Sequence, residues 1–121
     1  MESVGVAGLG LMGSAIASRL LAAGYEVVGY DIDGAKRERL TAAGGKAVDS
    51  LAALSARAST LMLAVFDTAQ VESVIDDALN SRANDAPRLT FVCTSTCDPD
   101  RIAKVAARIS ARADFVEMPV S

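Results

Sequence analysis

Three glycines near the N-terminus have the spacing of residues that hold a phosphate group. Gly8, Gly10 and Gly13 form the pattern G-x-G-x-x-G in the segment GLGLMG, directly after the apolar run Val4 to Ala7. In such a segment the first glycine allows a tight turn, the second lets the backbone approach a pyrophosphate, and the third lets the following helix pack closely. The pattern predicts an adenine dinucleotide as the ligand.

Backbone amides of this segment supply the binding chemistry. The N–H groups of Leu11, Met12 and Gly13 are expected at a helix N-terminus, where unpaired donors and the helix dipole favour an anion. The dipole contributes roughly 0.3–1 kcal/mol before hydrogen bonds are counted. Leu9, inside the same segment, is expected to join them in the site. The alternative is that the glycines only make a strand-to-helix turn, because a lone GxGxxG also arises by chance.

A carboxylate follows the glycines at the distance expected for ribose recognition. Asp31 lies 18 residues beyond Gly13, at the end of the strand-like segment Glu26 to Tyr30. It can accept from both ribose hydroxyls, and hydrogen bonds to a charged acceptor contribute roughly 1.5–3 kcal/mol. It also repels a 2′-phosphate by about 4 kcal/mol at about 4 Å and an effective dielectric near 20. NAD is therefore expected in preference to NADP, with Ile32 beside the same ribose.

Two cations follow this carboxylate, and two interpretations of them remain open. Lys36 and Arg37 begin a charged helical segment. They are either solvated side chains or cations that reach a 2′-phosphate and soften the preference for NAD.

The rest of the chain alternates between strand and helix patterns. Strands are expected at Val4–Leu9, Glu26–Tyr30, Lys46–Val48, Thr60–Val65, Leu89–Cys93 and Asp114–Met118. Helices are expected at Leu11–Ala23, Ala35–Ala43, Ser50–Ala56, Asp67 or Thr68 to Leu79, and Asp98–Ser110. In the first helix Met12, Ile16 and Leu20 are expected to form the apolar stripe. This alternation predicts an α/β fold, a Rossmann doubly wound parallel sheet of about six strands in the order 3-2-1-4-5-6. The ligand is then expected where the order reverses, between the first and fourth strands.

Composition limits the function further. A chain of 121 residues fits one domain, and its 51% hydrophobic content with few aromatic residues fits a tightly packed core. No segment approaches the roughly 20 apolar residues of a membrane span. The net charge of −3 is dispersed without a basic stripe, so neither a membrane nor a nucleic acid is an expected partner. A strand follows almost directly after Met1, leaving no room for a signal segment, and a cytoplasmic location is expected.

Two cysteines, Cys93 and Cys97, lie at the end of the fifth expected strand. Their spacing matches no common metal or redox motif, and the chain has no histidine to complete a metal site. No metal is expected. The cysteines are interpreted as reduced thiols, with a redox or catalytic role as the alternative.

Three short motifs occur together along the chain. They are GLGLMG at residues 8–13, STCDP at residues 95–99 and MPVS at residues 118–121. They are similar to the G-x-G-x-M-G, S-T-x-x-P and A-P-V-S-G-G segments of one family, and in that order. On these motifs the chain resembles the β-hydroxyacid dehydrogenases, which include 3-hydroxyisobutyrate dehydrogenases, tartronate semialdehyde reductases and 6-phosphogluconate dehydrogenases.

The resemblance implies roles for further residues. Thr96 would lie near the nicotinamide, Val65 and Phe66 would cover the adenosine ribose, and Ser121 would bind the substrate carboxylate. The alternatives are that Thr96 caps the helix near Asp98 and that Ser121 is only a frayed end. The chain departs from the family in lacking a proline after the fourth strand and in having Met118 where a small residue is usual.

The resemblance also implies what the complete protein does. The family transfers a hydride between a nicotinamide and a small hydroxy acid, and a helical domain with a catalytic lysine completes its active site and its dimer. Residues 1–121 correspond to the dinucleotide-binding domain alone, so no catalytic residue is assigned, and this part is expected to bind NAD without turnover. The alternatives are an NAD-sensing regulatory module and a non-catalytic relative that serves as an oligomerisation scaffold.

Overall fold

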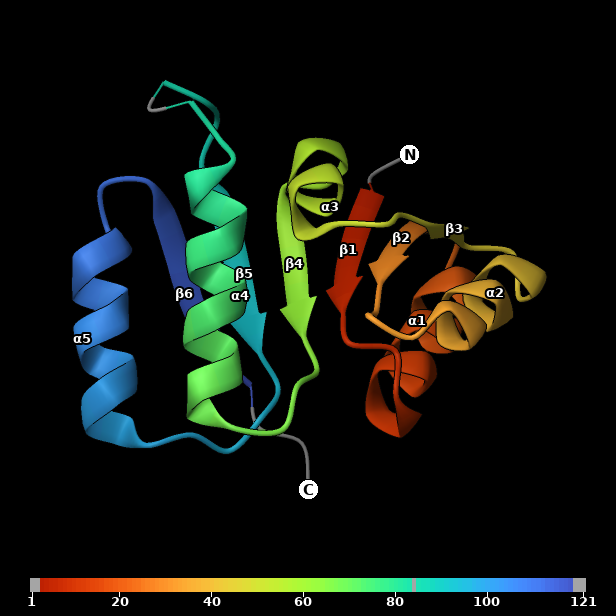
Figure 1. Cartoon of the computed structure of the whole chain (residues 1–121), viewed down its shortest axis with the longest axis horizontal. Coiled ribbons are helices and arrows are strands. Elements are labelled where there is room, and N and C mark those ends of the chain that lie inside the picture. The colour runs from red at the N-terminus through yellow and green to blue at the C-terminus, as the bar shows by residue number, and fades with distance from the viewer. Residues whose placement is uncertain (1–2, 84, 119–121) are drawn as a thin grey trace.

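A computed structural model describes residues 3–83 and 85–118, in which helices cover both faces of one parallel sheet (Figure 1). The strands are β1 (Ser3–Ala7), β2 (Glu26–Tyr30), β3 (Lys46–Ala47), β4 (Thr60–Leu63), β5 (Leu89–Cys93) and β6 (Ala113–Glu117). The helices are α1 (Leu11–Ala22), α2 (Gly34–Ala42), α3 (Leu51–Arg57), α4 (Thr68–Asn80) and α5 (Pro99–Ile109). The strand order is β3-β2-β1-β4-β5-β6 with every pair parallel, which confirms the predicted fold.

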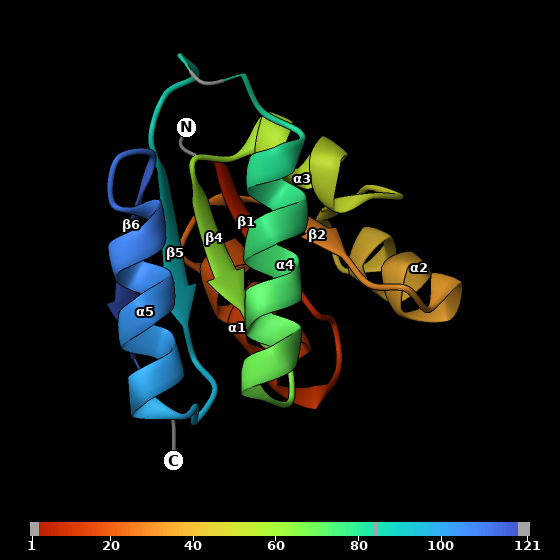
Figure 2. The same cartoon turned by 60° about the vertical axis from the view of Figure 1, so that its left-hand side comes forward.

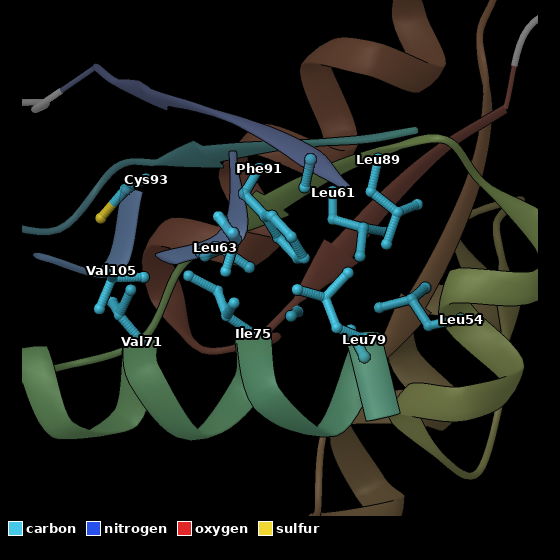
Figure 3. Close-up of a cluster of buried hydrophobic side chains, with 14 of the residues drawn as sticks. Leu54, Leu61, Leu63, Val71, Ile75, Leu79, Leu89, Phe91, Cys93 and Val105 are labelled. Carbon is cyan, nitrogen blue, oxygen red and sulfur yellow. The ribbon is translucent and has the colours of Figure 1, made fainter. Parts of the chain in front are cut away.

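Helices lie on opposite faces of the sheet, as the two views of the chain show (Figures 1 and 2), and an apolar core fills the space between each layer of helices and the sheet. The larger core joins α3, α4 and α5 to the sheet, and in Figure 3 Val71, Ile75 and Leu79 of α4 point toward the strand side chains. The smaller core joins α1 and α2 to the other face through Ala17 and Leu40. No helix in the described part of the chain is long and apolar enough to cross a membrane.

Side chains cap the first turns of four helices. The carboxylate or hydroxyl of the residue before each helix accepts from a backbone amide: Asp33 from Ala35, Ser50 from Ala53, Asp67 from Gln70, and Asp98 from Asp100 and Arg101. Capping by such residues satisfies amides that lack a partner within the helix. The alternative that Thr96 caps α5 is wrong, because Asp98 holds that position.

The predicted apolar stripe of α1 is confirmed for Ile16 and Leu20, which are partly buried and pack against the smaller core, and is wrong for Met12. The buried residues of α1 are Gly13 and Ala17, whereas Met12 is 40% exposed. A Cβ on Gly13 would lie 1.8 Å from the carbonyl oxygen of Gly8, so the helix backbone itself lies against the preceding turn. Gly13 and Ala17 are therefore fully buried with Ile16 and Leu20 partly buried beside them, whereas Met12 is left at the edge of the cleft.

Two of the strands, β1 and β4, end two residues earlier than predicted. β1 stops at Ala7 rather than Leu9, and β4 stops at Leu63 rather than Val65. The two residues removed from each strand belong to the loops at the carboxyl edge of the sheet. These loops are where the order of the strands reverses.

Candidate functional site

A cleft of about 690 Å³ opens at this carboxyl edge, which falls within the usual size of small-molecule sites, roughly 300–1,000 Å³. The arrowheads of β1, β4 and β5 in Figure 1 point toward the same edge. The lining residues come from the ends of β1 and β2, from the loops after β1, β2, β4 and β5, and from helices α1 to α4. They are Ala7, Gly8, Gly10, Leu11, Met12, Tyr30, Asp31, Ile32, Lys36, Leu51, Ala64, Val65, Phe66, Gln70, Val74, Thr94, Ser95 and Thr96. The predicted rim between the first and fourth strands is therefore where the cleft lies.

The three glycines of the first loop have different structural roles. Gly8 has a φ of +94°, and a Cβ there would lie 2.3 Å from the carbonyl oxygen of Ala64. Gly13 allows the close approach of α1 already described. A Cβ on Gly10 would meet no heavy atom within 4 Å, and Gly10 lines the cleft. The first and third glycines are thus required by packing, and the second keeps the cleft open.

The N-terminus of α1 carries free donors. Its capping residue is Gly10, which offers no side-chain acceptor, whereas the other described helices are capped by aspartate or serine. Within residues 3–83 and 85–118, no acceptor is found for the amides of Leu11, Met12 and Gly13. Unpaired amides at a helix N-terminus favour a bound anion, so this loop fits a pyrophosphate.

The carboxylate of Asp31 lines the cleft and is held from within the protein. Its Oδ2 accepts from the amide of Leu9 at 2.8 Å, and its Oδ1 accepts from the amide of Asp33 at 2.8 Å. Each carboxylate oxygen has further lone-pair capacity, so both can still accept from a sugar hydroxyl. Leu9 is itself buried and does not line the cleft, and its amide serves to orient Asp31. Ile32, next to Asp31, is 88% exposed at the cleft.

The two cations after Asp31 are placed differently from one another. Lys36 lines the cleft. Arg37 turns back, and its Nη1 donates to the carbonyl oxygen of Asp31 at 2.7 Å and to that of Ile32 at 3.4 Å. Arg37 is therefore neither a freely solvated side chain nor a cation pointing into the cleft.

The opposite wall is formed by the loops after β4 and β5. Val65, Phe66 and Thr96 line it, as expected, and Phe66 is 91% exposed. The Ser95 hydroxyl donates to the carbonyl oxygen of Val65, and the Phe66 amide donates to Oε1 of Gln70 at 2.6 Å. The first bond joins the two loops, and the second joins the loop after β4 to the first turn of α4.

Several lining residues were not expected from the sequence. Gln70 lies in the first turn of α4, whereas Thr94 and Ser95 belong to the loop after β5, which the strand order also predicts at this rim. Thr94 is buried and donates from Oγ1 to the carbonyl oxygen of Leu63 at 2.8 Å. Tyr30 and Leu51 carry no such signal, because their patterns are those of ordinary strand and helix residues. Ser121 lies outside the described residues.

The cysteines lie beside the cleft without lining it. Both are free thiols, with Sγ atoms 3.7 Å apart. Burial is the main cause that raises the pKa of the Cys93 thiol, to about 11. A buried thiol of this kind is a poor nucleophile.

The sheet order, the glycine turn and the carboxylate after β2 define a dinucleotide-binding domain of the Rossmann type. The chain belongs to the family of the NAD binding domain of 6-phosphogluconate dehydrogenase, whose family model matches residues 3–121. An NAD(P) cofactor follows from this membership.

Similar proteins include dehydrogenases of small hydroxy acids. The chain is 32% identical over 98 residues to L-threonate dehydrogenase of Cupriavidus necator, covering 81% of this chain and 33% of that protein. It is 28% identical over 121 residues to the mitochondrial 3-hydroxyisobutyrate dehydrogenase of Drosophila melanogaster, covering 99% and 37%. The crystal structure of a Salmonella typhimurium 3-hydroxyisobutyrate dehydrogenase superposes with a TM-score of 0.88 at 27% identity, covering 100% and 42%. The chain thus spans between a third and about two fifths of these relatives.

Proposed function

We propose that residues 1–121 are the NAD-binding domain of an oxidoreductase that transfers a hydride between a nicotinamide and a small, 3-hydroxyisobutyrate-like β-hydroxy acid. The observation that carries the proposal is the N-terminus of α1, which has no side-chain cap and faces an open cleft that the Asp31 carboxylate also lines. The similarity to L-threonate and 3-hydroxyisobutyrate dehydrogenases supports the choice of substrate class.

Each part of the cofactor is assigned to a part of the cleft. The amides of Leu11, Met12 and Gly13 hold the pyrophosphate, and the turn at Gly8, Leu9 and Gly10 leaves it room. Asp31 accepts hydrogen bonds from the adenosine ribose, and Ile32 lies beside it. Val65 and Phe66 cover the same ribose. Thr96 lies near the nicotinamide. When bound, the nicotinamide gives or receives the hydride. Ser121 is assigned to the substrate carboxylate on the motif MPVS alone.

The preference for NAD over NADP rests on the position of Asp31. Its carboxylate is oriented by two backbone amides, so it cannot turn away from an incoming 2′-phosphate without breaking both bonds. A repulsion of about 4 kcal/mol at about 4 Å and an effective dielectric near 20 corresponds to roughly a thousandfold in affinity. Lys36, the cation in the cleft lining, offsets part of this repulsion.

Turnover is expected to need more than this domain. General acid–base catalysis requires a group within hydrogen-bond reach of the substrate hydroxyl. Among the described lining residues the ionisable side chains are Tyr30, Asp31 and Lys36, and all three come from β2 or the residues that follow it. We therefore propose that a helical domain beyond residue 121 supplies the catalytic lysine and the contacts of a homo-oligomer. Free cysteines favour a reducing compartment, and we propose the cytoplasm.

Calorimetric titration of this chain with NAD and with NADP tests the proposal, together with assays for reduction of NAD by 3-hydroxyisobutyrate and L-threonate. We expect saturable binding of NAD, weaker binding of NADP and no turnover. The absence of saturable binding by either dinucleotide would reject the assigned function, and measurable turnover would reject the assignment of catalysis to a further domain.

A further inference from the structure

Arg37 of α2 makes contacts that neither interpretation of its sequence position anticipates. Its guanidinium lies over the loop between β2 and α2, where Nη1 donates to the carbonyl oxygens of Asp31 and Ile32. The side chain is partly buried, while Arg39, two residues further along the same helix, is exposed. Arg37 is therefore held in place by the chain that carries the ribose-binding carboxylate.

The loop has few other fixed points. Asp31 is bonded at its carboxylate by the amides of Leu9 and Asp33, and at its carbonyl by Arg37. The bond from Leu9 ties the carboxylate to the glycine turn, and the bond from Arg37 ties the backbone of the same residue to α2. Charge-assisted hydrogen bonds are shorter and stronger than neutral ones. Without the bond from Arg37 to the Asp31 carbonyl oxygen, the loop between β2 and α2 would be freer to move, and the Asp31 carboxylate would move with it.

The same contacts limit the ability of the Arg37 guanidinium to bind the 2′-phosphate of NADP. A guanidinium that donates to two carbonyl oxygens has part of its donor fork already engaged, and it does not line the cleft. Lys36 is the neighbouring cation that does line it. Of the two adjacent cations, Lys36 is therefore the one placed to contact a bound phosphate.

We propose that Arg37 is a positioning residue that fixes the Asp31 carboxylate for the adenosine ribose, and that it thereby strengthens the preference for NAD. This inference rests on the proposed function, since it assumes that Asp31 binds the ribose. It reverses the sequence interpretation in which Arg37 softens that preference by reaching a 2′-phosphate.

The test compares Arg37→Ala with Arg39→Ala in the full chain. Both substitutions remove one positive charge from α2, but only Arg37 contacts the loop. We measure dissociation constants for NAD and NADP well below the melting temperature of each variant. Arg37→Ala is expected to weaken NAD binding roughly tenfold and NADP binding much less. The dissociation constants for the two dinucleotides then lie closer together than in the original chain. Arg37→Lys, which can still donate to a carbonyl, is expected to recover most of the NAD affinity, and Arg39→Ala to match the original chain.

A second measurement needs no ligand. The amide of Leu9 donates to Asp31, so its hydrogen exchange reports whether the carboxylate is in place. We expect faster exchange of the Leu9 amide in Arg37→Ala and unchanged exchange in Arg39→Ala. This readout separates the inference from the proposed function, because it holds or fails whether or not NAD binds.

Three results would overturn the inference. A selective loss of NADP affinity in Arg37→Ala would show that the guanidinium binds the phosphate. Unchanged affinities for both dinucleotides, with the original chain binding NAD, would show that Arg37 only stabilises α2. Unchanged exchange at Leu9 would show that the carboxylate does not depend on Arg37.

Discussion

Replacing Gly10 by alanine separates binding from folding more sharply than any other change at the cleft. Gly10 has a φ of −71° and a ψ of −159°, which an alanine adopts without strain, and a Cβ there would meet no heavy atom within 4 Å. The free energy of unfolding should therefore change by less than about 1 kcal/mol, because the smaller freedom of alanine in the unfolded chain offsets its poorer fit at a helix N-cap.

The effect on binding should be large. The methyl group of Gly10→Ala would enter the cleft where a phosphate must approach the amides of Leu11 and Met12. Losing about two charge-assisted hydrogen bonds at roughly 1.5 kcal/mol each amounts to about 3 kcal/mol. NAD affinity should then fall by about a hundredfold or more.

Calorimetric titration with NAD measures the loss, and thermal unfolding without ligand measures the stability. Gly24→Ala provides a control with the opposite signature. Gly24 does not line the cleft and has a φ of +94°, so an alanine there is strained and should lower stability while leaving NAD affinity unchanged. If the dissociation constant of Gly10→Ala for NAD stayed within about threefold of that of the original chain, the assignment of the pyrophosphate to this loop would be refuted.

Three further changes have specific expected outcomes. Asp31→Ser removes the charge that repels a 2′-phosphate and should narrow the ratio of the NAD and NADP dissociation constants, so an unchanged ratio would remove Asp31 from the choice of cofactor. Gly13→Ala places a Cβ 1.8 Å from the carbonyl oxygen of Gly8 and should lower the free energy of unfolding by about 3 kcal/mol in urea denaturation, which a change below about 0.5 kcal/mol would contradict. Because burial raises the pKa of Cys93 to about 11, iodoacetamide at pH 8 should modify Cys97 first and Cys93 only as the pH approaches that value; equal modification at pH 8 would show that Cys93 is not shielded.

The sequence predicted the order of the strands because each element carried a local signal. Alternating patterns and glycines marked the elements, and residues that can cap a helix, such as Ser50 before α3, marked where helices begin. The rule that parallel strands bind ligands where their order reverses then placed Gly10, Asp31 and Thr96 around one cleft. The fold therefore followed from the hydrophobic periodicity of the sequence, and the position of the cleft followed from the order of the strands.

What the sequence missed depends on contacts between distant segments. Nothing local distinguishes Arg37, whose guanidinium reaches the loop, from Arg39, which is exposed. In α1 only Met12 was misplaced, because the close contact of Gly13 with Gly8 sets how the first turn lies and leaves Met12 exposed. Such features depend on backbone geometry and on where long side chains find acceptors.

The central claim is that the amides at the start of α1 hold a pyrophosphate while Asp31 holds the neighbouring sugar. Titrating an isotope-labelled chain with NAD and following its backbone amide resonances by NMR tests it most directly. The account predicts saturable shifts concentrated at residues 8–13 and at Asp31 and Ile32. Shifts that spared these residues and gathered elsewhere on the surface, or no saturable shifts at all, would contradict it.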